Sequence, residues 1–141
     1  MLSQLTIGAC LIVMTVLIHA VCLELILKAL IAIKTEIEVR WRVATFALLI
    51  LAIFLAHVIE IWVWAIFYFF IEEIPNLETA LYFSTSSFTT VGYGDVVLSE
   101  EWRLLSSIES INGMILFGWS TAFIFAIVRL IYEHHYRDAE A

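Results

Sequence analysis

One run of seven residues near the middle of the chain could hold a dehydrated cation with backbone oxygens. It reads Thr89-Thr90-Val91-Gly92-Tyr93-Gly94-Asp95. A cation entering a narrow pore must lose most of its water, and neutral carbonyl dipoles can replace that water without binding the ion too tightly for release. Aiming successive carbonyls at one axis needs unusual backbone angles, which glycine adopts readily. The motif predicts ion coordination by oxygens of Thr90, Val91, Gly92 and Tyr93, with a hydroxyl added by Thr90.

A single strand of this kind cannot surround an ion. Non-helical backbone at membrane depth is tolerated only where protein or water satisfies it. We expect the side chains of Val91 and Tyr93 to turn away from the ion and wedge the strand against its surroundings. Four copies of the chain can enclose an axis, so the motif predicts a homotetramer.

The composition is that of a membrane protein. Of 141 residues, 63% are hydrophobic and 15% charged, and the mean hydropathy is +1.00. Soluble domains keep roughly half of their residues apolar and about a quarter charged. A soluble enzyme is therefore excluded, and a net charge of −7 argues against a nucleic-acid partner. One Pro and five Gly indicate long helices, so we expect an all-α membrane protein.

Three apolar stretches exceed the roughly 20 residues that span a bilayer. We divide the chain accordingly into an extra N-terminal transmembrane helix, a polar interfacial connector, a pore domain and a short tail, at 1–33, 34–42, 43–131 and 132–141. The first stretch has no basic leader, so we expect a retained helix rather than a signal peptide. Cys10 and Cys22, about 18 Å apart on a helix, are expected to be small hydrophobic residues without a mutual disulfide.

The pore domain divides into an outer helix at 43–71, a short helix at 77–88, the non-helical run at 89–95 and an inner helix at 104–131. Asn76 is a favourable N-cap for the short helix, and the carboxylate of Glu78 suits its first turn. Gly92 and Gly94 prevent the helix from continuing.

Basic residues predict the orientation. Lys34, Arg40 and Arg42 lie between the first two spans, and Arg129 and Arg137 lie at or after the end of the last. The positive-inside rule places the connector and the C-terminus in the cytoplasm, so the N-terminus lies outside and the short helix enters from outside. The outer segment carries six acidic residues against one arginine, or −5 per chain, which would attract cations to its mouth.

From about Ala44 to Ile131 the chain resembles the pore domain of potassium channels of the two-transmembrane, pore-loop class, as in small bacterial members. The resemblance is carried by the run from Glu78 to Asp95, by Trp102-Arg103 and by the spacing of Gly113 and Gly118. It implies a potassium-selective passive channel in which 77–88 is a re-entrant pore helix and Thr90 to Gly94 is the selectivity filter that binds K⁺.

The resemblance also implies roles around the filter. Tyr82 would hydrogen-bond Asp95 behind the filter and support it. Gly113 would be the inner-helix hinge, although close helix packing explains Gly113 and Gly118 equally well. Thr121 would face the cavity, and Phe125 would form a hydrophobic inner gate unless it faces lipid or a neighbouring subunit.

The sequence departs from the family behind the filter. Many relatives have tryptophans where this chain has Tyr82 and Phe83, and some have a glutamate where it has Ser86. Glu109 could contact the filter scaffold in place of that glutamate. We favour the simpler interpretation that Glu109 is a carboxylate on the outer surface.

Three ionisable residues lie in the middle of the first two spans, namely His19, His57 and Glu60. Groups at this depth are costly and tend to have partners. The trio could sense protons and bias the inner helices, or its hydrogen bonds could dock the extra helix. We favour docking.

The sequence as a whole predicts a multi-pass homotetrameric K⁺ channel of the cell (plasma or inner) membrane. Its expected partners are copies of itself, K⁺ and the lipid bilayer. We expect no enzymatic activity, no cofactor, no nucleic acid and no small-molecule substrate. No span repeats Arg or Lys every third residue, so no voltage sensor is predicted. The alternatives are a weakly selective cation channel and a non-conducting regulatory membrane subunit.

Overall fold

The computed structural model describes residues 2–32 and 39–140, and within these ranges every regular element is a helix. The helices are α1 (Leu2–Ala32), α2 (Val39–Phe70), α3 (Leu77–Phe88) and α4 (Arg103–Glu140). Three of them contain segments long and apolar enough to cross a membrane, at Leu2–Ala32, Val43–Phe70 and Arg103–Leu130. The prediction of an all-α membrane protein is confirmed.

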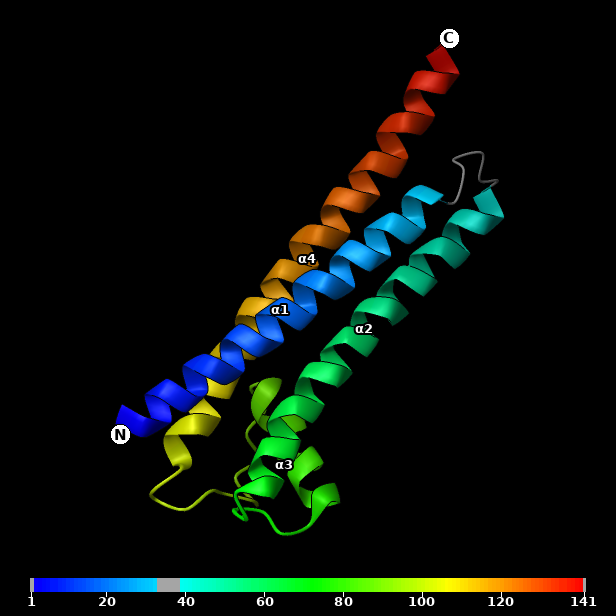
Figure 1. The fold of residues 1–141 in the computed structure, drawn as a ribbon. Helices are drawn as coiled ribbons and strands as arrows, with labels where there is room; N and C mark the ends of the chain where they lie inside the picture. Colours follow the sequence, from blue (N-terminus) through cyan, green and yellow to red (C-terminus); the bar gives the residue numbers. More distant parts are fainter. Residues whose placement is uncertain (1, 33–38, 141) are drawn as a thin grey trace.

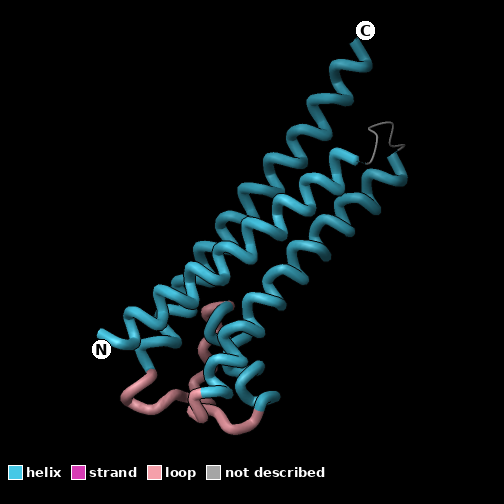
Figure 2. The backbone as a smooth tube through the Cα atoms, viewed as in Figure 1, coloured by secondary structure: helices cyan, strands magenta, loops and turns pink. Residues whose placement is uncertain are grey.

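The three long helices lie side by side, and α3 is placed at one end of their bundle (Figure 1). α1 contacts both α2 and α4, and α3 packs between α2 and α4. The loops that flank α3 gather at this same end, as the pink segments of Figure 2 show. The N-terminus lies at the end that holds α3, and the C-terminus lies at the opposite end (Figure 1).

α1 buries a stripe whose members are three or four residues apart, namely Gln4, Gly8, Leu11, Thr15, His19 and Leu23. This stripe holds the polar residues of the helix centre, while Leu17, Val21 and Leu25 are exposed. The arrangement reverses that of a helix on a water-soluble protein, whose polar face points outward. It fits a helix whose outer face meets lipid and whose polar side chains need protein partners.

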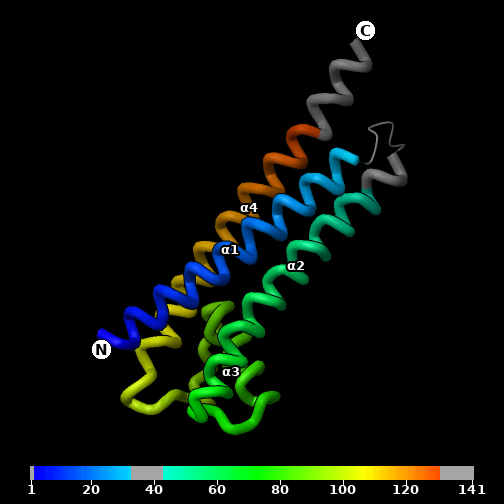
Figure 3. The backbone as a smooth tube through the Cα atoms, viewed as in Figure 1, coloured from blue at the N-terminus to red at the C-terminus, as the bar shows by residue number. Residues whose placement is uncertain are grey.

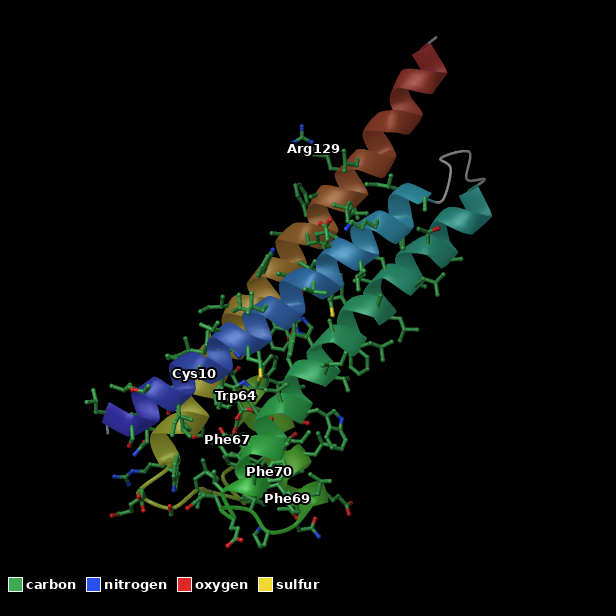
Figure 4. All side chains as sticks on the ribbon, in the orientation of Figure 1. Cys10, Trp64, Phe67, Phe69, Phe70 and Arg129 are labelled. Atoms are coloured by element: carbon green, nitrogen blue, oxygen red, sulfur yellow. The ribbon has the colours of Figure 1, made fainter. Side chains whose placement is uncertain are left out.

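The aromatic end of α2 forms the core around α3. Trp64, Tyr68, Phe83 and Phe88 are buried, and the rings of Tyr68 and Phe83 meet edge to face with centroids 5.2 Å apart. Such pairs contribute about 0.5–1.5 kcal/mol beyond the area they bury. In Figure 4 the labelled Trp64, Phe67, Phe69 and Phe70 all lie toward the end of α2 beside α3, while the labelled Arg129 lies far from them along α4. The aromatic packing fixes α3 against the bundle.

Residues 71–102 leave α2, pass through α3 and return to α4 at one end of the bundle (Figure 3). α3 covers the same residues as the expected short helix, and its cap is as expected because Asn76 Oδ1 accepts a hydrogen bond from Thr79 N at 3.0 Å.

Two expected boundaries differ from the structure. α2 begins at Val39, so the connector predicted to reach Arg42 is helical over its last four residues. Residues 33–38, the rest of the connector, lie outside the described residues. α4 continues to Glu140 through the predicted tail, because no Gly or Pro follows Gly118 to stop it. A change from apolar to charged composition alone does not end a helix.

Candidate functional site

The backbone after α3 alternates in the sign of φ. Thr90, Gly92 and Gly94 have φ of +62°, +57° and +78°, and the residues between them are not in the positive region. In a strand of uniform φ, successive carbonyls point to opposite sides. Reversing the sign of φ at every second residue counteracts that reversal, so successive carbonyls can share a side. Such a backbone allows coordination by Thr90 to Tyr93, which stays a prediction.

Thr90 is the unexpected member of this alternation. A β-branched residue at positive φ is an outlier that costs on the order of 1–3 kcal/mol and is found mainly at functional sites. Sequence reasoning assigned the unusual angles to the glycines alone. At Gly92 and Gly94 a Cβ would meet nothing within 4 Å, so the backbone angle and not a lack of space requires glycine there.

Hydrogen bonds from the last turn of α3 hold this backbone in place. Thr90 N donates to Ser87 O at 3.0 Å, and Gly92 N donates to Ser86 O at 3.1 Å. Tyr93 N donates to Ser86 Oγ at 3.4 Å. Ser86 therefore contacts the segment with both its main chain and its side chain, in the position where some relatives have a glutamate.

Tyr82 reaches the far end of the segment from the middle of α3. Its hydroxyl donates to Asp95 Oδ2 at 2.8 Å, and its ring stacks on Tyr93 with an interplanar angle of 5°. The expected Tyr82–Asp95 hydrogen bond is present, whereas its supporting role stays a prediction. This hydrogen bond to the carboxylate is the main reason why the pKa of Tyr82 is raised above its usual range.

Glu109 lies inside the protein and not on its outer surface, so the favoured interpretation was wrong. Its side chain is fully buried between α2, α3 and α4. Oε2 accepts a hydrogen bond from Tyr68 Oη at 2.9 Å, and Oε1 accepts one from Ser84 Oγ at 2.5 Å. Ser84 belongs to α3, so Glu109 links α4 to the short helix that ends at residues 89–95.

Gly113 packs directly against the end of α3. A Cβ at this position would lie 2.0 Å from Phe88 O, whereas a Cβ at Gly118 would meet nothing within 4 Å. The contact supports the packing interpretation for Gly113, and its role as a hinge stays a prediction. Thr121 Oγ1 donates to Phe117 O at 2.8 Å, and Phe125 is 68% exposed on the single chain. Their cavity and gate roles also stay predictions.

The structure brings His19, His57 and Glu60 together in the middle of the bundle. His19 Nδ1 lies 2.8 Å from Glu60 Oε1, and His57 Nδ1 lies 2.8 Å from Glu60 Oε2. The other ring nitrogens face Ser120 of α4, with His57 Nε2 at 3.0 Å and His19 Nε2 at 3.3 Å from its Oγ. The contacts join α1, α2 and α4, as docking requires, and proton sensing stays a prediction.

Sequence reasoning missed Ser120 as the fourth member of this cluster. A serine in a long helix can bond its own backbone, so it carries no signal by itself. The available signal was Asn112, two turns earlier on α4, which donates from Nδ2 to Thr15 Oγ1 at 2.8 Å. Asn112 and Ser120 lie eight residues apart on the α4 face that contacts α1, and both are buried polar residues.

Comparisons with known proteins identify the family of the chain. The model of the family described as "Ion channel" matches residues 56–129, more than half of the chain. Over 57 residues the chain is 44% identical to the voltage-gated potassium channel Kch of Escherichia coli (strain K12), an alignment that covers 40% of this chain and 14% of that protein. No solved structure matches the chain significantly. The chain therefore belongs to the ion channel family.

Proposed function

We propose that the chain is one subunit of a homotetrameric channel that conducts K⁺ selectively and passively across the membrane. The observation that carries this proposal is the alternating φ of Thr90, Gly92 and Gly94 in a backbone held at the end of α3. Carbonyl oxygens of residues 90–93 from four copies would replace the water around K⁺ in successive rings. The potassium channel named among the relatives supports the choice of ion.

The exposed surface of the single chain supports assembly. Val91 and Tyr93 within the segment are 52% and 72% exposed, and Val97 just after it is 74% exposed. Contiguous apolar patches of this kind mark interaction sites. Neighbouring copies would cover these side chains. Each strand of residues 89–95 would then be packed from behind and held in place for ion coordination. Four outer segments would together carry about −20 at the mouth and attract cations.

The remaining roles follow from the same assembly. The carbonyl end of α3, which ends at Phe88, would aim its negative dipole at a cavity below the filter. Thr121 would line that cavity. Phe125 would form the inner constriction, where a hydrophobic ring can close the pore by excluding water. Gly113 would let α4 approach α3, and Gly118 would let α4 bend.

We further propose that the α3 end of the bundle faces outward and that the C-terminus is cytoplasmic, in the cell (plasma or inner) membrane. The N-terminus and α3 lie at the same end, and the C-terminus lies at the opposite end (Figure 1). This placement agrees with an outer N-terminus and with the concentration of basic residues near the other end.

Ion flux through the purified chain in liposomes tests the proposal. We expect K⁺ flux from the wild type and from Val13→Ala, an exposed position on α1. Gly92→Ala should remove selective flux, because alanine disfavours the φ of +57° at this position. The reversal potential in mixed K⁺ and Na⁺ measures selectivity. Equal permeability would indicate a weakly selective cation channel, and absence of flux would indicate a non-conducting subunit; either result contradicts the proposal.

A further inference from the structure

We propose that His19, His57 and Glu60 form a binding site for a divalent transition metal ion such as Zn²⁺, at the contact of α1, α2 and α4. Both histidines direct Nδ1 at Glu60, each 2.8 Å from a different carboxylate oxygen. One ligand atom from each of the three residues can be chosen so that all lie within 4.8 Å of one another. Imidazole nitrogen and carboxylate oxygen are ligands that zinc takes, and a set of two histidines and one glutamate leaves a fourth position for a solvent molecule.

Ser120 is placed to orient both rings around such an ion. A histidine that binds a metal through one nitrogen almost always donates its other N–H to a neighbouring acceptor. Here the two remaining nitrogens converge on one atom, Ser120 Oγ, at 3.0 Å from His57 and 3.3 Å from His19. A hydroxyl oxygen has two acceptor lone pairs, one for each ring N–H.

Proton accounting shows which tautomers an ion would select. Two neutral rings that donate from Nδ1 to Glu60 would leave two Nε2 acceptors facing one hydroxyl, whose single proton serves only one of them. With an ion on both Nδ1 atoms, each ring would instead carry its proton on Nε2 and donate it to Ser120 Oγ, with no net gain or loss of protons. Each arrangement leaves one group of the cluster unpaired, a ring nitrogen in the first and the Ser120 O–H in the second, so the proposal rests on the convergence of the ligand atoms.

An ion would require the two nitrogen–oxygen pairs to open and the two Nδ1 atoms, which approach different oxygens of Glu60, to converge on one centre. Zinc distances of about 2.0–2.2 Å place neighbouring ligands of a tetrahedral site about 3.3 Å apart. The two nitrogen–oxygen pairs, now at 2.8 Å, would open by about half an ångström.

Aromatic rings surround the cluster and limit access of water. The His57 ring centroid lies 4.7 Å from that of Phe117 and 6.1 Å from that of Phe88, and the His19 centroid lies 5.2 Å from that of Trp119. An apolar shell of this kind controls solvent access and the local dielectric at a metal site. Phe88 is the last residue of α3, so a bound ion would fix three long helices beside the start of the proposed filter.

Metal binding to the chelator-treated, purified full chain tests the proposal, and it does not depend on conduction. We expect one Co²⁺ per chain with the intense visible absorption of four-coordinate cobalt, displaced by Zn²⁺. Because an ion that binds only the folded chain stabilises it, added Zn²⁺ should raise the Tm. Ser120→Ala should weaken binding by about 10–100-fold. His19→Gln and Glu60→Gln, which remove a ligand, should weaken binding further and abolish the rise in Tm.

The chain supplies its own control, since its other two histidines are His134 and His135. The double variant His134→Ala/His135→Ala should bind as the wild type does. Binding lost in that variant but retained in His19→Gln would overturn the proposal. If the ligand variants fail to fold, the wild type still decides: no bound Co²⁺, a six-coordinate spectrum, or a Tm unchanged by Zn²⁺ would each overturn it.

Discussion

Glu109 shows how much a single buried carboxylate can connect. It joins Tyr68 of α2 and Ser84 of α3 to α4, and all three side chains are fully buried. A hydrogen bond contributes about 0.5–1.5 kcal/mol net, and a buried hydroxyl left without its partner costs about 1–3 kcal/mol. Position and selectivity of the segment after α3 should therefore depend on this residue although it lies outside the segment.

We predict that Glu109→Ala lowers the stability of the protein by about 2–4 kcal/mol, since it removes two buried hydrogen bonds and leaves the Tyr68 hydroxyl without its partner, while Ser84 Oγ keeps Ile61 O as an acceptor at 2.9 Å. It should also reduce the preference for K⁺ over Na⁺ in the reversal potential. Tyr68→Phe is the matched control, because it removes one of the two hydrogen bonds and should cost about 1–2 kcal/mol. Unchanged stability and unchanged currents in Glu109→Ala would show that the carboxylate does not support the filter.

Tyr82 gives a prediction about pH. Its pKa is raised in the folded protein, so the stabilisation from the Tyr82–Asp95 hydrogen bond is fully present below the ordinary pKa of about 10. It is lost as the pH rises through the folded pKa, because the ionised phenol no longer donates. The difference in stability between wild type and Tyr82→Phe should be constant from pH 7 to about 9 and shrink at higher pH. A difference that grows with pH would contradict the assignment.

At the scale of the elements, the packing of α4 on α3 depends on the absence of a side chain at Gly113. A Cβ there would lie 2.0 Å from Phe88 O, which is backbone and cannot turn aside. At Gly118, also inside α4, a Cβ would contact nothing within 4 Å of the same chain. Alanine substitutions at the two positions therefore distinguish two effects. At Gly113 we expect a steric clash, and at Gly118 we expect only a change in helix propensity.

Gly113→Ala should destabilise the protein by about 1–3 kcal/mol or more, as overpacking does. Gly118→Ala should be neutral or stabilising by up to about 1 kcal/mol, since alanine is the better helix former. Thermal unfolding of both variants checks this pair. Equal effects at the two positions would mean that α3 and α4 do not meet as described.

The polar stripe of α1 gives the second prediction at this scale. Thr15 and Asn112 join α1 to α4 by one buried hydrogen bond of 2.8 Å. A double-mutant cycle with Thr15→Val and Asn112→Leu should give a coupling of about 0.6 kcal/mol, and at most about 1.7 kcal/mol, as for other hydrogen bonds between membrane helices. Additive effects would remove this contact from the account of how α1 docks.

The elements differ in how far their sequences revealed them. α3 was predictable because Asn76 and the glycines after Phe88 are local signals that act through the backbone. The burial of Glu109 and the part played by Ser120 were not, because each depends on which helix covers which face of α4. In a membrane helix both the packed and the lipid-facing sides are apolar, so hydrophobic periodicity does not reveal that choice. The positive φ of Thr90 likewise depends on carbonyls of Ser86 and Ser87 that a sequence does not place.

At the scale of the whole molecule, the part of the described chain that matches the ion channel family is packed against one further helix, α1. Residues 56–129 match the ion channel family, while the whole of α1 lies before that match and is held by polar contacts to α2 and α4. The segment after α3 is exposed on the single chain. Its proposed function is therefore a property of an assembly, since no single copy surrounds an ion.

Locating bound ions in the assembled protein tests the central claim most directly. A structure determined in Rb⁺ or Tl⁺, heavier substitutes for K⁺, would place them by anomalous scattering. The account predicts a tetramer with several ions on its fourfold axis, each ringed by main-chain oxygens of residues 90–93 from all four copies. A protein without fourfold symmetry, or a tetramer in which these oxygens point away from the axis and no ion lies between them, would contradict it.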